Sequence, residues 1–140
     1  MNKQIIEELV LNGHIVIAVG GGGVPIYRHE NNYLEAIEAV IDKDRASSLL
    51  AQQIDAEVLY IITDVPKIYI NYGKPNQKSL DVITVTEAEK YMDDNQFADG
   101  SMKPKVLAAI NFLKNGGGKA IITSEQEIGK ETGGTQIISE

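Results

Sequence analysis

The chain has 140 residues, enough for one domain, with an ordinary apolar content of 43% and a formal net charge of −7. The acidic balance and the lack of a dense Lys/Arg run exclude the electrostatic footprint of a nucleic-acid binder or an anionic-membrane binder. The sequence has no cysteine, which excludes disulfides and thiolate metal sites, and no apolar run reaches the ~18 residues of a membrane span, so we expect a cytoplasmic protein.

The first quarter of the chain predicts a helix and two strands. Residues 2–12 carry apolar side chains at helical spacing and are followed by Gly13, a common helix stop. Residues 14–19 are a short run rich in isoleucine and valine, which predicts a buried parallel strand. Residues 24–28 predict a second, short strand before a turn at residues 31–32.

The rest of the chain predicts alternating helices and strands. An apolar stretch at residues 34–41 fits neither type clearly. Beyond it, helices are expected at residues 42–54, 87–93 and 102–113, and strands at residues 58–62, 68–71, 82–85, 120–123 and 135–138. Thr86 and Glu89 are spaced as a capping box for the second of these helices. The alternation predicts an α/β domain with a mostly parallel sheet, in which ligands bind beyond the carboxyl ends of the strands.

A run of four glycines follows the first expected strand: Gly20, Gly21, Gly22 and Gly23. A backbone without side chains can turn its N–H groups around an anion, so this run is a candidate phosphate-binding loop, with a flexible turn as the alternative. It matches neither familiar phosphate motif. A dinucleotide fingerprint needs glycine near Pro25 or Ile26, and a P-loop needs Gly-Lys-Ser/Thr after the run.

Lysines open two of the expected helices. Lys43 lies between Asp42 and Asp44 in a first turn, and Lys103 and Lys105 lie in another. A lysine at the positive end of a helix costs about 0.3–1 kcal/mol, and a bound anion removes that cost. Neutralisation by the flanking aspartates, or simple solvation, is the alternative. The same misfit at two helix starts favours an anion site.

The remaining candidates are carboxylates and histidines. Asp64 directly follows an expected strand and can bond a ribose or a metal, although its spacing favours a turn cap. His14 and His29 have no third ligand at metal-site spacing, so we expect no protein metal site. Spacing alone therefore predicts a phosphate-binding α/β domain and names no substrate.

Six segments, taken together and in order, resemble the carbamate kinases of the amino acid kinase family. They are residues 14–26 with the glycine run, 38–44 with Asp-Lys-Asp, 62–65 with Thr-Asp-Val, 70–77, 96–105 with Gly-Ser-Met-Lys-Pro-Lys, and 118–124. The resemblance implies a three-layer αβα sandwich. It also implies that residues 1–140 form a single domain, the C-terminal nucleotide-binding lobe, and that the family's N-terminal half is absent.

The resemblance also implies an activity. Such enzymes transfer a phosphoryl group reversibly between ATP and carbamate with Mg²⁺, and in cells commonly form ATP from carbamoyl phosphate and ADP in arginine fermentation. They are homodimers. With half of the family's chain absent, little turnover is expected from this chain alone.

The same resemblance assigns roles to individual residues. Lys43 would contact nucleotide phosphates, Lys105 would stabilise the phosphoryl group in transfer, and Asp44 would hold both lysines. The glycine run would face the transferring group. The nucleotide site would be lined by Thr63, Asp64, Val65, Tyr69 and Met102.

Two departures and two alternatives accompany the resemblance. Asp99 stands where the family often has proline, and Val19 where a small polar residue is common. One alternative is the lobe of another family member, such as an acylglutamate, aspartate or uridylate kinase. The other is a non-catalytic nucleotide-binding remnant. The Asp-Lys-Asp triplet at residues 42–44 and the segment 97–105 favour a carbamate kinase.

Overall fold

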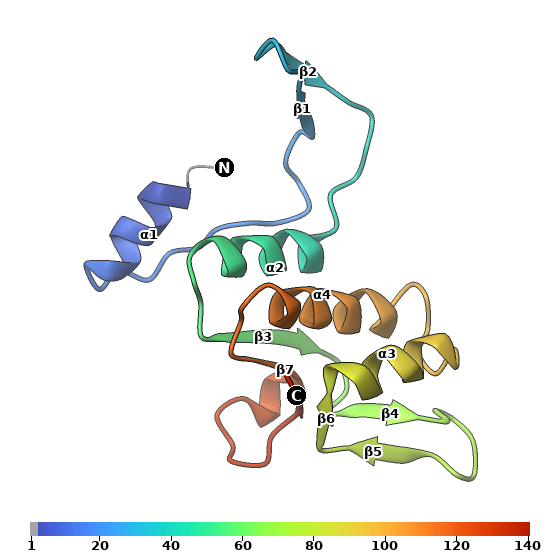
Figure 1. Ribbon diagram of the computed structural model, residues 1–140. Helices are drawn as coiled ribbons and strands as arrows, with labels where there is room; N and C mark the ends of the chain where they lie inside the picture. The colour runs from blue at the N-terminus through green and yellow to red at the C-terminus, as the bar shows by residue number, and fades with distance from the viewer. Residues whose placement is uncertain (1–2) are drawn as a thin grey trace.

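The computed structural model describes residues 3–140 (Figure 1). Its elements, in chain order, are α1 (Lys3–Leu11), β1 (Ile26–Arg28), β2 (Leu34–Ala36), α2 (Lys43–Gln53), β3 (Val58–Thr63), β4 (Ile68–Ile70), β5 (Lys78–Leu80), β6 (Val82–Thr84), α3 (Val85–Asp93), α4 (Met102–Lys114), β7 (Lys119–Ser124), the short 3-10 helix η1 (Glu125–Glu127) and β8 (Thr135–Ile138). None of the helices within residues 3–140 is long and apolar enough to cross a membrane.

A four-stranded sheet with the order β3-β7-β8-β6 forms the centre of the fold. β3 runs parallel to β7, with Leu59 opposite Ala120, and β6 runs parallel to β8. β7 and β8 are antiparallel. Two of the three pairings are therefore parallel, which confirms the α/β class and the mostly parallel sheet.

Helices cover one face of this sheet. Figure 1 shows α4 between α2 and α3, with α4 above β3, and α4 contacts both of these helices and the strands β7, β3 and β8. The side chains between the layers form the core, in which Phe112, Ile122 and Ile137 are fully buried. On the opposite face, Val58, Tyr60 and Ile62 of β3 are exposed, because alternate residues of a strand point to opposite sides.

The strand expected at residues 14–19 is wrong. These residues form no regular element, and Ile15 and Ile17 are 98% and 99% exposed. A strand requires a neighbour that accepts and donates its backbone hydrogen bonds, and no strand of the described residues lies beside this segment. The apolar composition indicates a preference for a buried strand, but residues 3–140 do not provide the packing partner that burial needs.

The start of α3 also differs from the expectation by two residues. The capping box is formed by Thr84 and Glu87 rather than by Thr86 and Glu89. The Glu87 N–H donates to Thr84 Oγ1 at 3.2 Å, and the Thr84 N–H donates to Glu87 Oε2 at 2.9 Å. Both pairs have the same spacing, so the pattern alone could not choose between them.

Gly134 provides a stability prediction, because the backbone there allows no side chain. Its φ is 85°, and a Cβ would lie 2.8 Å from Thr123 Cβ and 2.9 Å from the Ile122 carbonyl oxygen. We expect Gly134→Ala to lower the free energy of unfolding by about 3 kcal/mol, measured by urea denaturation. Gly129 has a φ of 79° in open space, so Gly129→Ala should cost only about 1 kcal/mol. Equal losses from the two variants would contradict the steric explanation.

Candidate functional site

Helices α2 and α4 begin at the same end of the molecule. Asp44, in the first turn of α2, contacts Lys105, in the first turn of α4, and Ser48 one turn later contacts Ala108. The contacts advance in the same direction along both helices, so the two helices are parallel. Their positive N-terminal ends therefore lie together, which makes this corner favourable for an anion.

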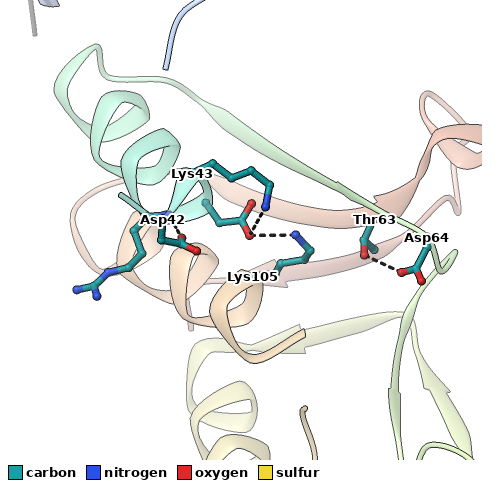
Figure 2. A network of polar contacts seen from close by, with 7 residues as sticks. Asp42, Lys43, Thr63, Asp64 and Lys105 are labelled. Carbon is teal, nitrogen blue, oxygen red and sulfur yellow. Dashed lines mark hydrogen bonds and ion pairs between the residues drawn. The ribbon is translucent and has the colours of Figure 1, made fainter. Parts of the chain in front are cut away.

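The two lysines that open these helices meet at one carboxylate. Asp44 Oδ2 lies 2.9 Å from Lys105 Nζ and 3.8 Å from Lys43 Nζ. Figure 2 shows both ammonium groups directed at this oxygen from different helices. Lysines that open two different helices are therefore brought to one carboxylate.

The two lysines are held differently. The side chain of Lys105 is 11% exposed and that of Asp44 is 12% exposed, so their close ion pair is largely shielded from water. The side chain of Lys43 is 66% exposed and its contact is longer, which leaves it free to swing toward a ligand. One carboxylate faces two ammonium groups, so the cluster keeps an excess positive charge despite the acidic chain.

Neighbouring charged residues of the same helix starts do not join the cluster. Asp42 is the N-cap of α2, and its Oδ1 accepts the Arg45 N–H at 2.8 Å. Lys103 Nζ lies 2.6 Å from Asp99 Oδ1 instead. Of the two lysines that open α4, only Lys105 reaches Asp44.

A cavity of about 180 Å³ lies at the first turn of α4, the turn that also carries Lys105. It is enclosed by the loop after β3, by β4 and the loop after it, and by the start of α4. Four residues expected in the nucleotide site lie on its wall: Asp64, Val65, Tyr69 and Met102. Thr63 does not line it, but its hydroxyl donates to Asp64 Oδ1 at 3.0 Å, as Figure 2 shows at the end of β3.

The cavity wall contains further residues that the sequence does not single out. Tyr72, Gln96, Phe97, Ala98 and Ser101 complete it. Gln96 Oε1 accepts the Asn71 N–H at 2.8 Å and so fixes the loop that carries Tyr72. The Tyr69 and Tyr72 rings lie 5.9 Å apart between centroids. Aromatic walls of this kind suit a planar heterocycle.

The cavity and the lysine cluster are joined through the first turn of α4. Met102 lines the cavity, and Lys105 follows it by three residues, so both side chains lie on one face of the helix. A ligand with a flat ring in the cavity could therefore extend a charged group toward Lys105 and Lys43. The candidates on α2 and α4 meet at Asp44, and the first turn of α4 also reaches the cavity that Asp64 lines.

The glycine run lies against the segment that leads into α2. A Cβ at Gly21 would be 3.2 Å from the Ile41 carbonyl oxygen, two residues before Lys43. Gly22 and Gly23 have open space around them. The run therefore lies close to the backbone that leads to the lysine cluster. Because glycine has no side chain, nothing on these residues would obstruct an anion that approaches their backbone N–H groups.

Dedicated metal ligands do not gather in the part of the chain that the structure describes. Residues 3–140 contain no group of three or more His, Cys, Asp or Glu side chains arranged to hold an ion.

Comparison with known proteins places the chain in a family. Residues 1–124 match the profile of the amino acid kinase family. The chain is 58% identical over 124 residues to the carbamate kinase of Thermoplasma volcanium, covering 89% of this chain and 40% of that protein. It is 48% identical to the carbamate kinase of Thermococcus kodakarensis over an alignment of 145 residues, gaps included, which covers the whole chain and 45% of that protein.

Solved structures give the same assignment. The carbamate kinase from Giardia lamblia bound to AMP-PNP superposes on the whole chain with a TM-score of 0.91 at 40% identity, using half of its own length. The N-acetylglutamate synthase from Neisseria gonorrhoeae, at 18% identity and a TM-score of 0.71, shares the fold alone.

The chain thus spans about 40% of the length of the curated carbamate kinases that it matches. The family profile covers most of its residues, and the fold agrees with that of solved members. This chain belongs to the amino acid kinase family.

Proposed function

We propose that this chain is the nucleotide-binding part of a carbamate kinase, which transfers a phosphoryl group reversibly between ATP and carbamate. The observation that carries the proposal is the convergence of Lys43 and Lys105 on Asp44, at a helix turn that also lines an aromatic-walled cavity. The similarity to carbamate kinases supports it, as does the AMP-PNP bound to the similar enzyme from Giardia lamblia.

In this proposal the base of ATP or ADP occupies the cavity between Tyr69, Tyr72 and Met102. Asp64 and Val65 lie beside it at the end of β3, with Asp64 held by Thr63. The phosphates then run along the first turn of α4 toward the lysine cluster. The proposed path follows from the position of the lysines relative to the cavity.

Each charged residue has a distinct role in the proposed transfer. Lys43 is loosely held and exposed, so it is suited to follow the phosphates. Lys105 is fixed at 2.9 Å from Asp44, so it is suited to face charge that develops on the moving phosphoryl group. Asp44 keeps the two ammonium groups from repelling each other before the nucleotide binds. Gly20 to Gly23 would supply backbone N–H groups to the same oxygens.

Phosphoryl transfer requires positioning and positive charge more than covalent chemistry, so no nucleophilic side chain is needed. Mg²⁺ would accompany the nucleotide and neutralise charge on its phosphate oxygens. We also propose that the chain supplies the nucleotide-binding half of the active site and has little kinase activity by itself. We further propose that it acts in a homo-oligomer.

Removing the Lys43 charge tests the nucleotide site directly. We expect Lys43→Ala to weaken MgADP binding by about tenfold or more, since a charge-assisted bond to phosphate is lost. Isothermal titration calorimetry on the purified chain measures this affinity. The side chain is exposed, so the fold should be unaffected.

Lys103→Ala is the matched control for this experiment. Lys103 also opens a helix at this corner, but its ammonium is engaged by Asp99. It should leave MgADP affinity within about twofold of the wild-type value. Equal heats from wild type and Lys43→Ala, or no binding by the wild type, would count against the proposed site.

A further inference from the structure

A buried serine joins the two helices that carry the lysine cluster. Ser48 is 2% exposed in the middle of α2, and its hydroxyl donates to the Ala108 carbonyl oxygen of α4 at 2.8 Å. Gln52 Nε2 donates to Ser48 Oγ at 3.1 Å and so orients the hydroxyl. A serine inside a helix is less favourable than alanine, and burial of a hydroxyl adds a cost unless it is bonded.

The serine contact forms a second rung beside the ion pair. Ser48 lies four residues after Asp44 on α2, and Ala108 lies three residues after Lys105 on α4, so each pair shares one helix face. The rungs are 2.9 Å and 2.8 Å long and are separated by one turn. Two rungs on parallel helices fix their axial register more firmly than one rung.

The packing around Ser48 explains why a polar bond can set this register. Ala51 of α2 and Ala108 and Ala109 of α4 are small residues buried in the same core cluster. Small side chains bring the helices close but interlock weakly, so they resist sliding less than large ones. The directional hydrogen bond from Ser48 supplies the missing constraint.

We infer that Ser48 is a positioning residue, which acts through the α2–α4 register to hold the Asp44 carboxylate against the Lys105 ammonium. The inference rests on the proposed function, because that function gives the spacing of these charges its importance. Loss of the hydroxyl leaves the Ala108 carbonyl bonded within its own helix, so Ser48→Ala should fold.

A double-mutant cycle on unfolding tests the inference without any ligand. In the wild-type background, Ser48→Ala should raise the unfolding equilibrium constant about fivefold in urea denaturation. In the Lys105→Met background, the same change should raise it by less than about twofold, because the ion pair that depends on the register is already lost. A purely structural hydrogen bond would give equal factors in both backgrounds and would overturn the inference.

Two controls accompany the cycle. Ser48→Ala should act equally in the wild-type and Lys103→Met backgrounds, because Lys103 pairs with Asp99 instead. Ser47→Ala removes a neighbouring hydroxyl for which the structure shows no bond across to α4, so it should show no coupling to Lys105. Coupling that appears in either control would also overturn the inference.

Titration with Mg·AMP-PNP separates this inference from the proposed function. If Ser48 positions Lys105, Ser48→Ala should weaken binding about threefold to fivefold, and the loss should shrink in Lys105→Met. Wild-type protein that binds no nucleotide while the unfolding cycle shows coupling would refute the proposed function alone. Nucleotide binding that is indifferent to Ser48→Ala in the wild-type background would refute the positioning role alone.

Discussion

Replacing Lys105 with methionine is expected to slow ATP formation from carbamoyl phosphate and MgADP by about a thousandfold or more. The change keeps most of the length of the side chain and removes its ammonium group, and with it the charge and the hydrogen-bond donors. Lys105 is held 2.9 Å from Asp44 with an 11% exposed side chain, so water cannot readily replace the missing ammonium. The loss should fall mainly on kcat, because a fixed charge at the transferring group favours the transition state over bound substrate.

The assay is made in a chimera with a longer relative. The chain corresponds to 40% of the carbamate kinase of Thermoplasma volcanium, so it can replace the matching part of that protein in a chimera. Coupled detection of ATP then gives kcat and KM. Lys103→Met in the same chimera should retain near-normal turnover. A Lys105→Met chimera with more than about a tenth of the parent rate would refute the assigned role, and preference for another acid substrate would favour a different branch of the family.

Asp44→Ala is expected to lower the free energy of unfolding by about 3 kcal/mol, and the melting temperature by about 10 °C. The change leaves the Lys105 ammonium nearly buried without its counter-charge. It also removes the carboxylate that faces both the Lys105 and the Lys43 ammonium groups. It also removes an acidic residue from the first turn of α2. Urea denaturation and calorimetry measure the two quantities.

Asp42→Ala provides the comparison. Asp42 is the N-cap of α2 and its loss should cost only about 1 kcal/mol, because water replaces an exposed capping bond. The difference between the two variants reports the ion cluster rather than the helix end. If the two variants lose the same free energy of unfolding, Asp44 would be an ordinary helix-start residue and the ion cluster would not stabilise the fold.

Most of the helices and strands can be predicted from local sequence, because the residues that begin and end them act over only a few positions. Asp42 caps α2 and Gly116 lies beyond the end of α4, both as the residue types predict. The buried strand β7 is recognisable from its apolar run. The strand β5 is not, since residues 78–80 carry a lysine and a serine and pair only with the three-residue β4.

The segment at residues 14–19 has a composition typical of a strand, but local sequence does not determine whether it forms one. Its composition indicates a preference for burial, yet burial is a property of a pair of surfaces, and one sequence segment specifies only one of them. Val19 adopts a φ of 68°, which is unusual for a β-branched residue, in this unpaired stretch. Periodicity within the segment carries no information on whether it has a neighbour within residues 3–140.

The site divides in a similar way. The misfit of lysines at helix starts is visible in the sequence, and so is the general position of Asp64 after a strand. That α2 and α4 run parallel with their first turns in contact depends on tertiary packing, and so do the roles of Ser48 and Gln96. No local signal points to the inter-helix bond, because Asp44, Ala51 and Gln52 share the helix face of Ser48 and do not set it apart as a buried position.

The position of β3 at the margin of the sheet affects how the purified protein will behave at high concentration. One side of its backbone has no strand partner among the described residues, and Val58, Tyr60 and Ile62 present uncharged side chains on its open face. Natural sheets usually discourage the addition of further strands with a lysine, a proline or a bulge at such a margin. This strand has none of these, so solubility during storage will depend on keeping the chain dilute.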